Sequence, residues 1–216
     1  LCLHEDHAVH IAQGYAQTTD EPMGCILHSN VGLMHGLMGI FNSWCNRVPM
    51  VVMGATGPVD APQRRPWIDW IHTAKDQGGL LRNFVKYDDE PRSAEALVET
   101  MLRVNQAIRT APRGPAYVCL DAGLQEAAVQ GDLHIPDLDR FAVPAPPEPP
   151  AESVATAANM LVKAENVVMM CGRLRRSRDA WDKRVKLAEL LGAGVITDIK
   201  VGAGFPTDHL LHLAPP

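Results

Sequence analysis

Apolar and polar positions along the first 125 residues follow two alternating patterns. Short apolar runs bounded by proline, glycine or polar residues predict strands that are buried in a sheet. The expected strands are residues 1–3, 23–27, 49–53 and 116–120. Longer segments that place apolar residues three or four positions apart predict helices, at residues 6–17, 32–46 and 93–110. Strands and helices in alternation indicate an α/β fold with a parallel sheet.

The segment from Gln125 to Ala151 departs from both patterns because prolines accumulate in it. Six prolines lie between positions 136 and 150, and so many fit neither a helix nor a central strand. The segment therefore predicts an extended linker. Beyond it, helical and strand patterns alternate again at residues 153–164, 167–170, 177–191 and 195–197. We expect a first domain at residues 1–124, a linker at 125–151 and a second α/β domain at 152–216.

Composition narrows the class of protein. The 216 residues include 20 basic and 25 acidic side chains, a formal net charge of −5. A nucleic-acid groove needs a positive field, so nucleic acid is not an expected partner. No apolar run reaches the ~18 residues of a membrane span, and no signal peptide is visible. The five cysteines are widely spaced, which indicates a reduced, cytoplasmic protein.

Polar side chains follow two of the expected strands. Glu5 comes after the first strand, and His28-Ser29-Asn30 comes after the second. Because ligands of parallel sheets bind beyond the carboxyl ends of the strands, we expect these side chains at one cleft. Taken alone, Glu5 at a helix start would only favour the helix dipole. A zinc site at His7 and His10 is the other alternative, but it lacks an evident third ligand.

Other motifs carry less information. Gly32, Gly36 and Gly39 lie at helical spacing, which indicates close packing of helices. Gly202 and Gly204 form a GxG without the third glycine of a dinucleotide fingerprint. Four arginines between positions 173 and 178 could hold phosphate at a helix start, although a solvated charged turn is the simpler explanation. The remaining histidines are expected to be structural or solvent-facing: His35, His72, His134, His209 and His212.

Residues 5–16 read Glu-Asp-His-Ala-Val-His-Ile-Ala-Gln-Gly-Tyr-Ala. This segment is similar to Glu-x-x-Ala-x-x-x-Ala-x-Gly-Tyr-Ala of the thiamine-diphosphate-dependent enzymes, the class of acetolactate synthase, benzoylformate decarboxylase and pyruvate decarboxylase. Further similarities follow in the family's order at residues 27–32, 42–44, 48–52, 111–118 and 200–209. The resemblance implies a three-layer parallel sheet that is the pyrimidine-binding domain without its first strand, followed by part of the central domain. Sequence is therefore expected to be missing at both ends.

The resemblance also implies roles for the residues at the strand ends. In that family the carboxylate at the position of Glu5 hydrogen-bonds to pyrimidine N1′ and promotes loss of the thiazolium C2 proton, so a buried Glu5 is expected. His28-Ser29 resembles benzoylformate decarboxylase, in which the histidine is implied in proton transfer. The expected catalytic residues are Glu5, His28 and Ser29. The expected cofactor contacts are Glu5, His28, Asn30, Gly32 and His35, where family members often have asparagine at the position of His35.

The reaction implied is decarboxylation of a 2-oxo acid. The alternatives are an acetolactate-synthase-like carboligase and a non-catalytic thiamine-binding domain. The family's Gly-Asp-Gly…Asn motif is absent from the chain, so Mg²⁺ is expected to bind through a C-terminal domain, and this chain alone is expected to be inactive. FAD binds the central domain of some relatives, but no motif here supports it. The family further implies a homodimer or homotetramer with the active site between subunits.

Overall fold

The computed structural model describes residues 1–198, 202 and 204–214. The chain divides into two compact units, Leu1–Ala145 and Pro146–Pro216. The division falls inside the proline-rich segment 125–151, where residues 127–137 and 142–150 form no regular element. The domain boundaries proposed from the sequence stay predictions.

The first unit is built on a parallel sheet. Its strands, in their order across the sheet, are β1 (Met23–Ile26), β2 (Met50–Thr56), β4 (Pro115–Asp121) and the short β3 (Asp88–Asp89). Met23 of β1 pairs with Met50 of β2, which in turn pairs with Pro115 of β4. All three strand pairings are parallel, as the alternation of elements predicts.

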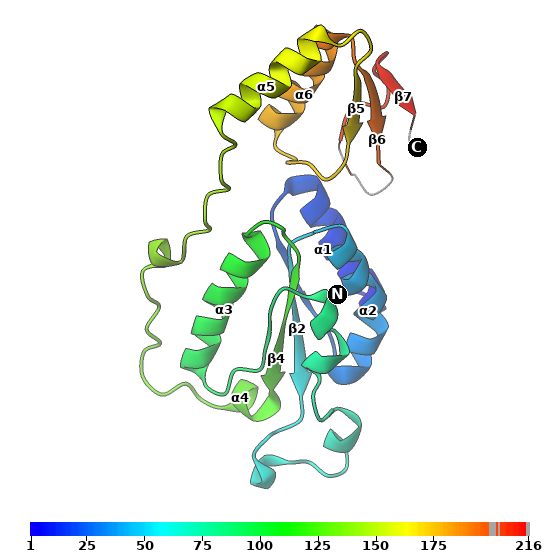
Figure 1. Ribbon diagram of the computed structural model, residues 1–216. Coiled ribbons are helices and arrows are strands. Elements are labelled where there is room, and N and C mark those ends of the chain that lie inside the picture. Colours follow the sequence, from blue (N-terminus) through cyan, green and yellow to red (C-terminus); the bar gives the residue numbers. More distant parts are fainter. Residues whose placement is uncertain (199–201, 203, 215–216) are drawn as a thin grey trace. The chain divides into compact units, whose positions relative to one another are not determined.

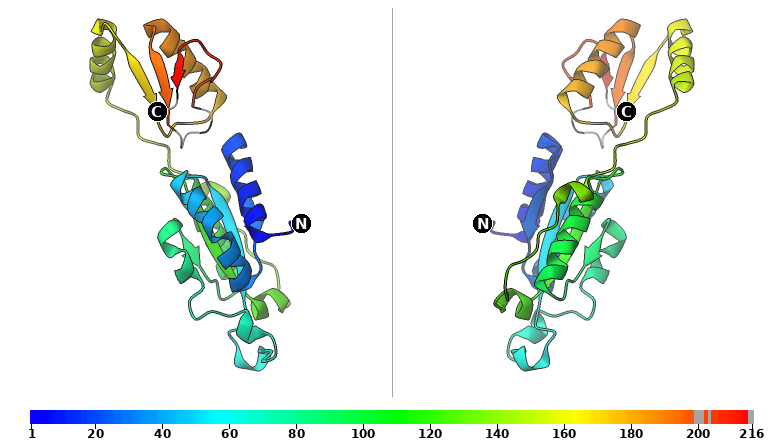
Figure 2. Two further views of the ribbon diagram at one scale, coloured as in Figure 1. Left: turned by 90° about the vertical axis from the view of Figure 1, so that its right-hand side faces the viewer. Right: turned by 90° about the vertical axis from the view of Figure 1, so that its left-hand side faces the viewer.

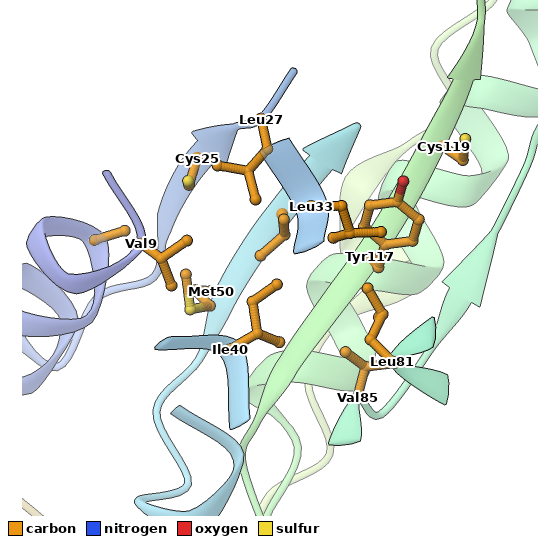
Figure 3. Packing of buried hydrophobic residues seen from close by; sticks show 12 residues of the cluster. Val9, Cys25, Leu27, Leu33, Ile40, Met50, Leu81, Val85, Tyr117 and Cys119 are labelled. Atoms are coloured by element: carbon orange, nitrogen blue, oxygen red, sulfur yellow. The ribbon is translucent and has the colours of Figure 1, made fainter. Parts of the chain in front are cut away.

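Helices cover both faces of this sheet. Helices α1 (Glu5–Thr19) and α2 (Ser29–Cys45) lie on one face and α3 (Ala94–Arg109) lies on the other (Figure 1). The pleat of β4 divides its side chains between two cores: Tyr117 packs toward α2, whereas Val118 packs toward Val104 of α3. Figure 3 shows the first core, which includes Val9, Leu33 and Tyr117. The three-layer α/β fold is thus confirmed.

Two glycines let α1 and α2 approach closely. A Cβ atom at Gly36 would lie 3.0 Å from Cγ2 of Val9, and one at Gly39 would lie 2.7 Å from Cγ1 of the same residue. Val9 is completely buried, so it has no room to move away. The expectation that these glycines allow close helix packing is confirmed.

Two expectations about the strands were wrong, and two short elements were missed. Residues 1–3 form no strand and lie exposed. The strand expected at residues 49–53 does not end before Gly54, because β2 continues to Thr56. A Cβ at Gly54 would overlap the Tyr117 hydroxyl, so glycine there makes room for the ring on the next strand. The short β3 and the helix α4 (Ala122–Glu126) were not expected, since both are too short to show a period.

A long loop of residues 57–87 separates β2 from β3. It begins at the end of β2 (Figure 2) and contains four 3₁₀ helices: η1 (Ala61–Gln63), η2 (Asp69–Ile71), η3 (Gly78–Leu80) and η4 (Arg82–Phe84). Gln77 anchors the loop to the sheet, because its buried amide Nε2 donates to the Ala55 carbonyl (2.9 Å) and to the Tyr117 hydroxyl (2.8 Å). Burial also raises the pKa of Tyr117, which therefore stays protonated.

The second unit is a smaller parallel sheet with the order β5-β6-β7. Along the chain its elements are α5 (Ala151–Lys163), β5 (Val168–Cys171), α6 (Arg178–Leu191), β6 (Gly194–Thr197) and β7 (His212–Ala214). The first four of these were expected, and β7 was missed. The turn η5 (Leu138–Phe141) belongs to the first unit. The motif proposed at 200–209 lies partly outside the described residues, at Lys200, Val201 and Ala203.

Candidate active site

Glu5 is the first residue of α1, and the preceding loop fixes its place. The helix begins there because the Nδ1 atom of His4 accepts a hydrogen bond from the backbone N–H of Asp6 at 3.1 Å, which caps the helix. His4 also stacks on the ring of His35, with 5.0 Å between the ring centroids. Glu5 therefore starts the helix with its carboxylate next to α2.

The carboxylate of Glu5 is held between His35 and Gly32, both on α2. Oε2 of Glu5 lies 3.1 Å from Nδ1 of His35, and since a carboxylate only accepts, the proton is on Nδ1. A Cβ at Gly32 would lie 3.0 Å from Cγ and 3.2 Å from Oε1 of Glu5. Glycine at position 32 thus leaves the space that the carboxylate occupies.

These contacts hold the pKa of Glu5 below its usual value. The backbone N–H of Glu5 itself makes the largest contribution, and the hydrogen bond from His35 adds to it. The side chain of Glu5 keeps 27% of its surface exposed, whereas the family resemblance implied a buried carboxylate. The carboxylate is therefore only partly buried, and burial opposes the lowering of its pKa.

A prediction follows for the pair of Glu5 and His35. Replacing His35 by phenylalanine removes both the hydrogen bond and the nearby cation, so the pKa of Glu5 should rise toward its ordinary value. His35→Asn keeps a donor without the charge, and the rise should be smaller. An NMR titration of ¹³C-labelled glutamate carboxyl groups measures both variants against the unchanged protein. A Glu5 pKa that is the same in His35→Phe would show that the contact has no electrostatic effect.

His28 and Ser29 lie where α2 begins, beside the loop after β2. His28 is exposed, and its ring meets the ring of His72 edge-on, with 4.8 Å between centroids. Ser29 is buried and has a φ of 48°, in the left-handed region that side chains rarely adopt. Its hydroxyl donates to the His72 carbonyl at 2.5 Å and lies 3.1 Å from Oδ1 of Asn30. His28, Ser29 and Asn30 are therefore grouped with His72.

Most of the residues expected at one cleft are brought together. Gly32 connects the two groups, because a Cβ there would lie 3.2 Å from Oε1 of Glu5 and also 3.2 Å from Cβ of His28. His35, expected from the residues alone to be structural, contacts Glu5 directly. The place of His72 in this group was missed, because its loop has no periodic pattern that would bring it to the start of α2.

One cluster in the described residues could hold a metal ion, and its members are His4, Glu5 and His35. Their ligand atoms lie within 4.8 Å of one another, and the cluster contains neither His7 nor His10. Two imidazoles and a carboxylate suit transition metals, whereas Mg²⁺ takes oxygen ligands. The cluster does not fit Mg²⁺.

Comparison with known proteins agrees with this geometry. Residues 1–78 match the family model described as thiamine pyrophosphate enzyme, N-terminal TPP binding domain. The chain is thus similar, over its first 78 residues, to the thiamine pyrophosphate enzymes. Among these it is 24% identical, over 99% of its length, to the probable acetolactate synthase large subunit of Methanocaldococcus jannaschii, and 24% identical, over 88%, to benzoylformate decarboxylase of Pseudomonas aeruginosa.

Solved structures of thiamine pyrophosphate enzymes share the fold. All of this chain superimposes on 39% of benzoylformate decarboxylase from Polynucleobacter necessarius, with a TM-score of 0.83 and 21% sequence identity. The chain spans about a third of the length of the curated relatives named above, 36% and 35%. None of the helices in the described residues is long and apolar enough to cross a membrane.

The residues around Glu5 fit the pyrimidine side of thiamine diphosphate. A carboxylate is the right partner for a protonated ring nitrogen, and among the described side chains only His35 donates to it. A side chain at position 32 would crowd Oε1 of Glu5, because its Cβ would lie 3.2 Å away, so glycine keeps this oxygen accessible. For the diphosphate and its metal ion, the described residues offer no oxygen-ligand cluster.

Proposed function

We propose that the protein containing this chain decarboxylates a 2-oxo acid with thiamine diphosphate, and that this chain supplies the residues that activate the cofactor. The observation that carries the proposal is the convergence of Glu5 and His28 on Gly32. A carboxylate for the pyrimidine ring, from α1, and an imidazole for the reacting centre, at the start of α2, thereby lie beside the first turn of α2.

Each residue has a separate task in this proposal. Thiamine diphosphate, when bound, supplies a thiazolium carbon that becomes nucleophilic on loss of its proton. Glu5 holds a proton at pyrimidine N1′, while His35 keeps the Glu5 carboxylate in place through Oε2. His28 would move a proton to or from the substrate, a role that suits an exposed imidazole. Asn30 and Gly32 line the same turn.

The remaining features of the proposal come from the family. Mg²⁺ would bind the diphosphate through another part of the protein, and the active site would lie between two copies in a homodimer or homotetramer. The relatives include enzymes named acetolactate synthase, so a carboligase is the second candidate. His28-Ser29 favours the decarboxylase, because the histidine gives the site a proton donor for the product.

The substitution His28→Ala tests the decarboxylase. Aromatic and aliphatic 2-oxo acids are screened for CO₂ release with the complete protein, thiamine diphosphate and Mg²⁺. We expect His28→Ala to lower kcat about 10²-fold, the lower end of what a general acid or base contributes. Unchanged turnover would remove the role of His28, and acetolactate as the main product from pyruvate would favour the carboligase.

A further inference from the structure

Few contacts fix the orientation of the His28 ring, although proton transfer requires a defined orientation. It is the N-cap residue of α2, yet its side chain makes no capping hydrogen bond. Among the residues that the structure describes, no hydrogen bond to the His28 ring is formed, and the side chain is exposed. The ring contact that it does make is the edge-on one with His72 at 4.8 Å. The orientation of His28 therefore depends on His72.

His72, in contrast, is fixed at both its ring and its backbone. The ring Nδ1 lies 3.1 Å from the Ile68 carbonyl, an acceptor, so Nδ1 carries the proton and donates it. The His72 carbonyl accepts the hydroxyl of Ser29 at 2.5 Å. The side chain of the next residue, Thr73, accepts the backbone N–H of Gly57 at 3.2 Å, which ties the loop to the end of β2. His72 is therefore the better-ordered ring of the two.

The hydroxyl of Ser29 donates its hydrogen to the His72 carbonyl. A hydroxyl has one hydrogen, and of its two acceptors the His72 carbonyl, at 2.5 Å, is closer than Oδ1 of Asn30, at 3.1 Å. Ser29 is only 4% exposed and its backbone has a positive φ, a strained conformation that persists only where the surroundings enforce it. Ser29 thus joins the loop of residues 57–77 to the start of α2, directly beside His28.

We propose that His72 is a positioning residue for His28, and that Ser29 acts through His72 rather than on the substrate. The edge-on contact restricts the rotation of the His28 ring, and the bonds to Ile68 and Ser29 keep His72 in place. This inference rests on the proposed role of His28 in proton transfer. It changes the role expected for Ser29, from a catalytic residue to the anchor of the loop.

Two substitutions of His72 distinguish a role in positioning His28 from a role in transferring a proton. His72→Phe keeps an aromatic ring against His28 but cannot exchange a proton, whereas His72→Ala removes the ring. With a 2-oxo acid as substrate, we expect His72→Ala to lower kcat by about 10- to 10²-fold through misplacement of His28, while KM changes little. His72→Phe should recover most of this loss. His72→Phe as impaired as His72→Ala, or His72→Ala with unchanged kcat, would overturn the proposal. His134→Ala, at an exposed histidine outside the site, is the control.

A second measurement does not depend on turnover. The ring ¹H–¹³C NMR signal of His28 should shift in His72→Ala because the neighbouring ring is lost, and it should stay near its original position in His134→Ala. An unmoved His28 signal in His72→Ala would overturn the inference even in an active enzyme. If no 2-oxo acid is turned over by the unchanged protein, the proposed function fails, while the signal still decides whether His72 positions His28.

Hydrogen exchange tests the part played by Ser29. Ser29→Ala removes the bond to the His72 carbonyl, so the amides of residues 57–77 should exchange faster. His72→Ala retains that carbonyl, and the loop should stay protected by the Ser29 hydroxyl. Equal exchange in Ser29→Ala and the unchanged protein would contradict the anchoring role.

Discussion

Glu5→Gln is expected to lower kcat/KM for a 2-oxo acid by about 10⁴-fold, the upper end of the range for a positioned acid or base. Glutamine has nearly the shape of glutamate and fits the space beside Gly32, so the fold should be kept. It cannot exchange a proton with the pyrimidine ring, however. Steady-state rates of CO₂ release by the complete protein, with thiamine diphosphate and Mg²⁺ in excess, measure the effect.

The neighbouring carboxylate provides the matched control. Asp6 lies in the same first turn of α1 and interacts with the helix dipole as Glu5 does. Its carboxylate pairs with His10, at 3.3 Å, rather than with His35. Asp6→Asn should therefore leave turnover close to that of the unchanged protein. Equal losses in Glu5→Gln and Asp6→Asn would show that both residues serve only the helix.

Gly39→Ala is expected to have the largest effect on stability. The new Cβ would lie 2.7 Å from Cγ1 and 3.1 Å from Cβ of Val9, and 3.3 Å from the ring of His10. Since Val9 is buried against the sheet, the helices α1 and α2 must separate. Overpacking of this kind lowers the free energy of unfolding by about 1–3 kcal/mol. Urea unfolding, followed by circular dichroism, measures it.

A glycine-to-alanine substitution at an exposed position of these helices should instead raise the free energy of unfolding. Gly14 lies inside α1, is exposed, and would carry a Cβ with nothing within 4 Å of it. Alanine there should raise the free energy of unfolding by about 0.5–1 kcal/mol through its better helix propensity. If Gly39→Ala stabilises the protein as Gly14→Ala does, the close contact between α1 and α2 is absent in solution.

The regular elements could be predicted because their periods are local. Helix α3 was expected at residues 93–110 and occupies Ala94–Arg109, where Ser93 caps it. Strands that run through the core, such as β4, show as continuous apolar runs. The end of β2 was missed because Gly54 is a common strand terminator, and only the Tyr117 ring on the neighbouring strand explains it. Such a reason lies in tertiary packing and leaves no local pattern.

Some residues of the candidate site could likewise be predicted from the sequence, and others could not. Glu5, His28 and Ser29 could be proposed from the sequence because each follows an expected strand or precedes a helix, and the family motif covers all three. His72 lies in a loop that has neither period nor motif, and only the folded chain brings it to Ser29. The desolvation of Glu5 was overestimated, because a motif identifies a residue without showing what covers it. Its pKa is lowered here by hydrogen bonds.

The most direct test of the role of Glu5 is the rate at which the thiazolium C2 proton of bound thiamine diphosphate exchanges with deuterium. Rapid mixing with D₂O, an acid quench and ¹H NMR of the released cofactor give this rate without any substrate. Exchange in Glu5→Gln is expected to be at least about 10²-fold slower than in the unchanged protein, with exchange in Asp6→Asn unaltered. Equal exchange rates in Glu5→Gln and the unchanged protein, with the cofactor bound in both, would contradict the assignment of Glu5 as the activating carboxylate.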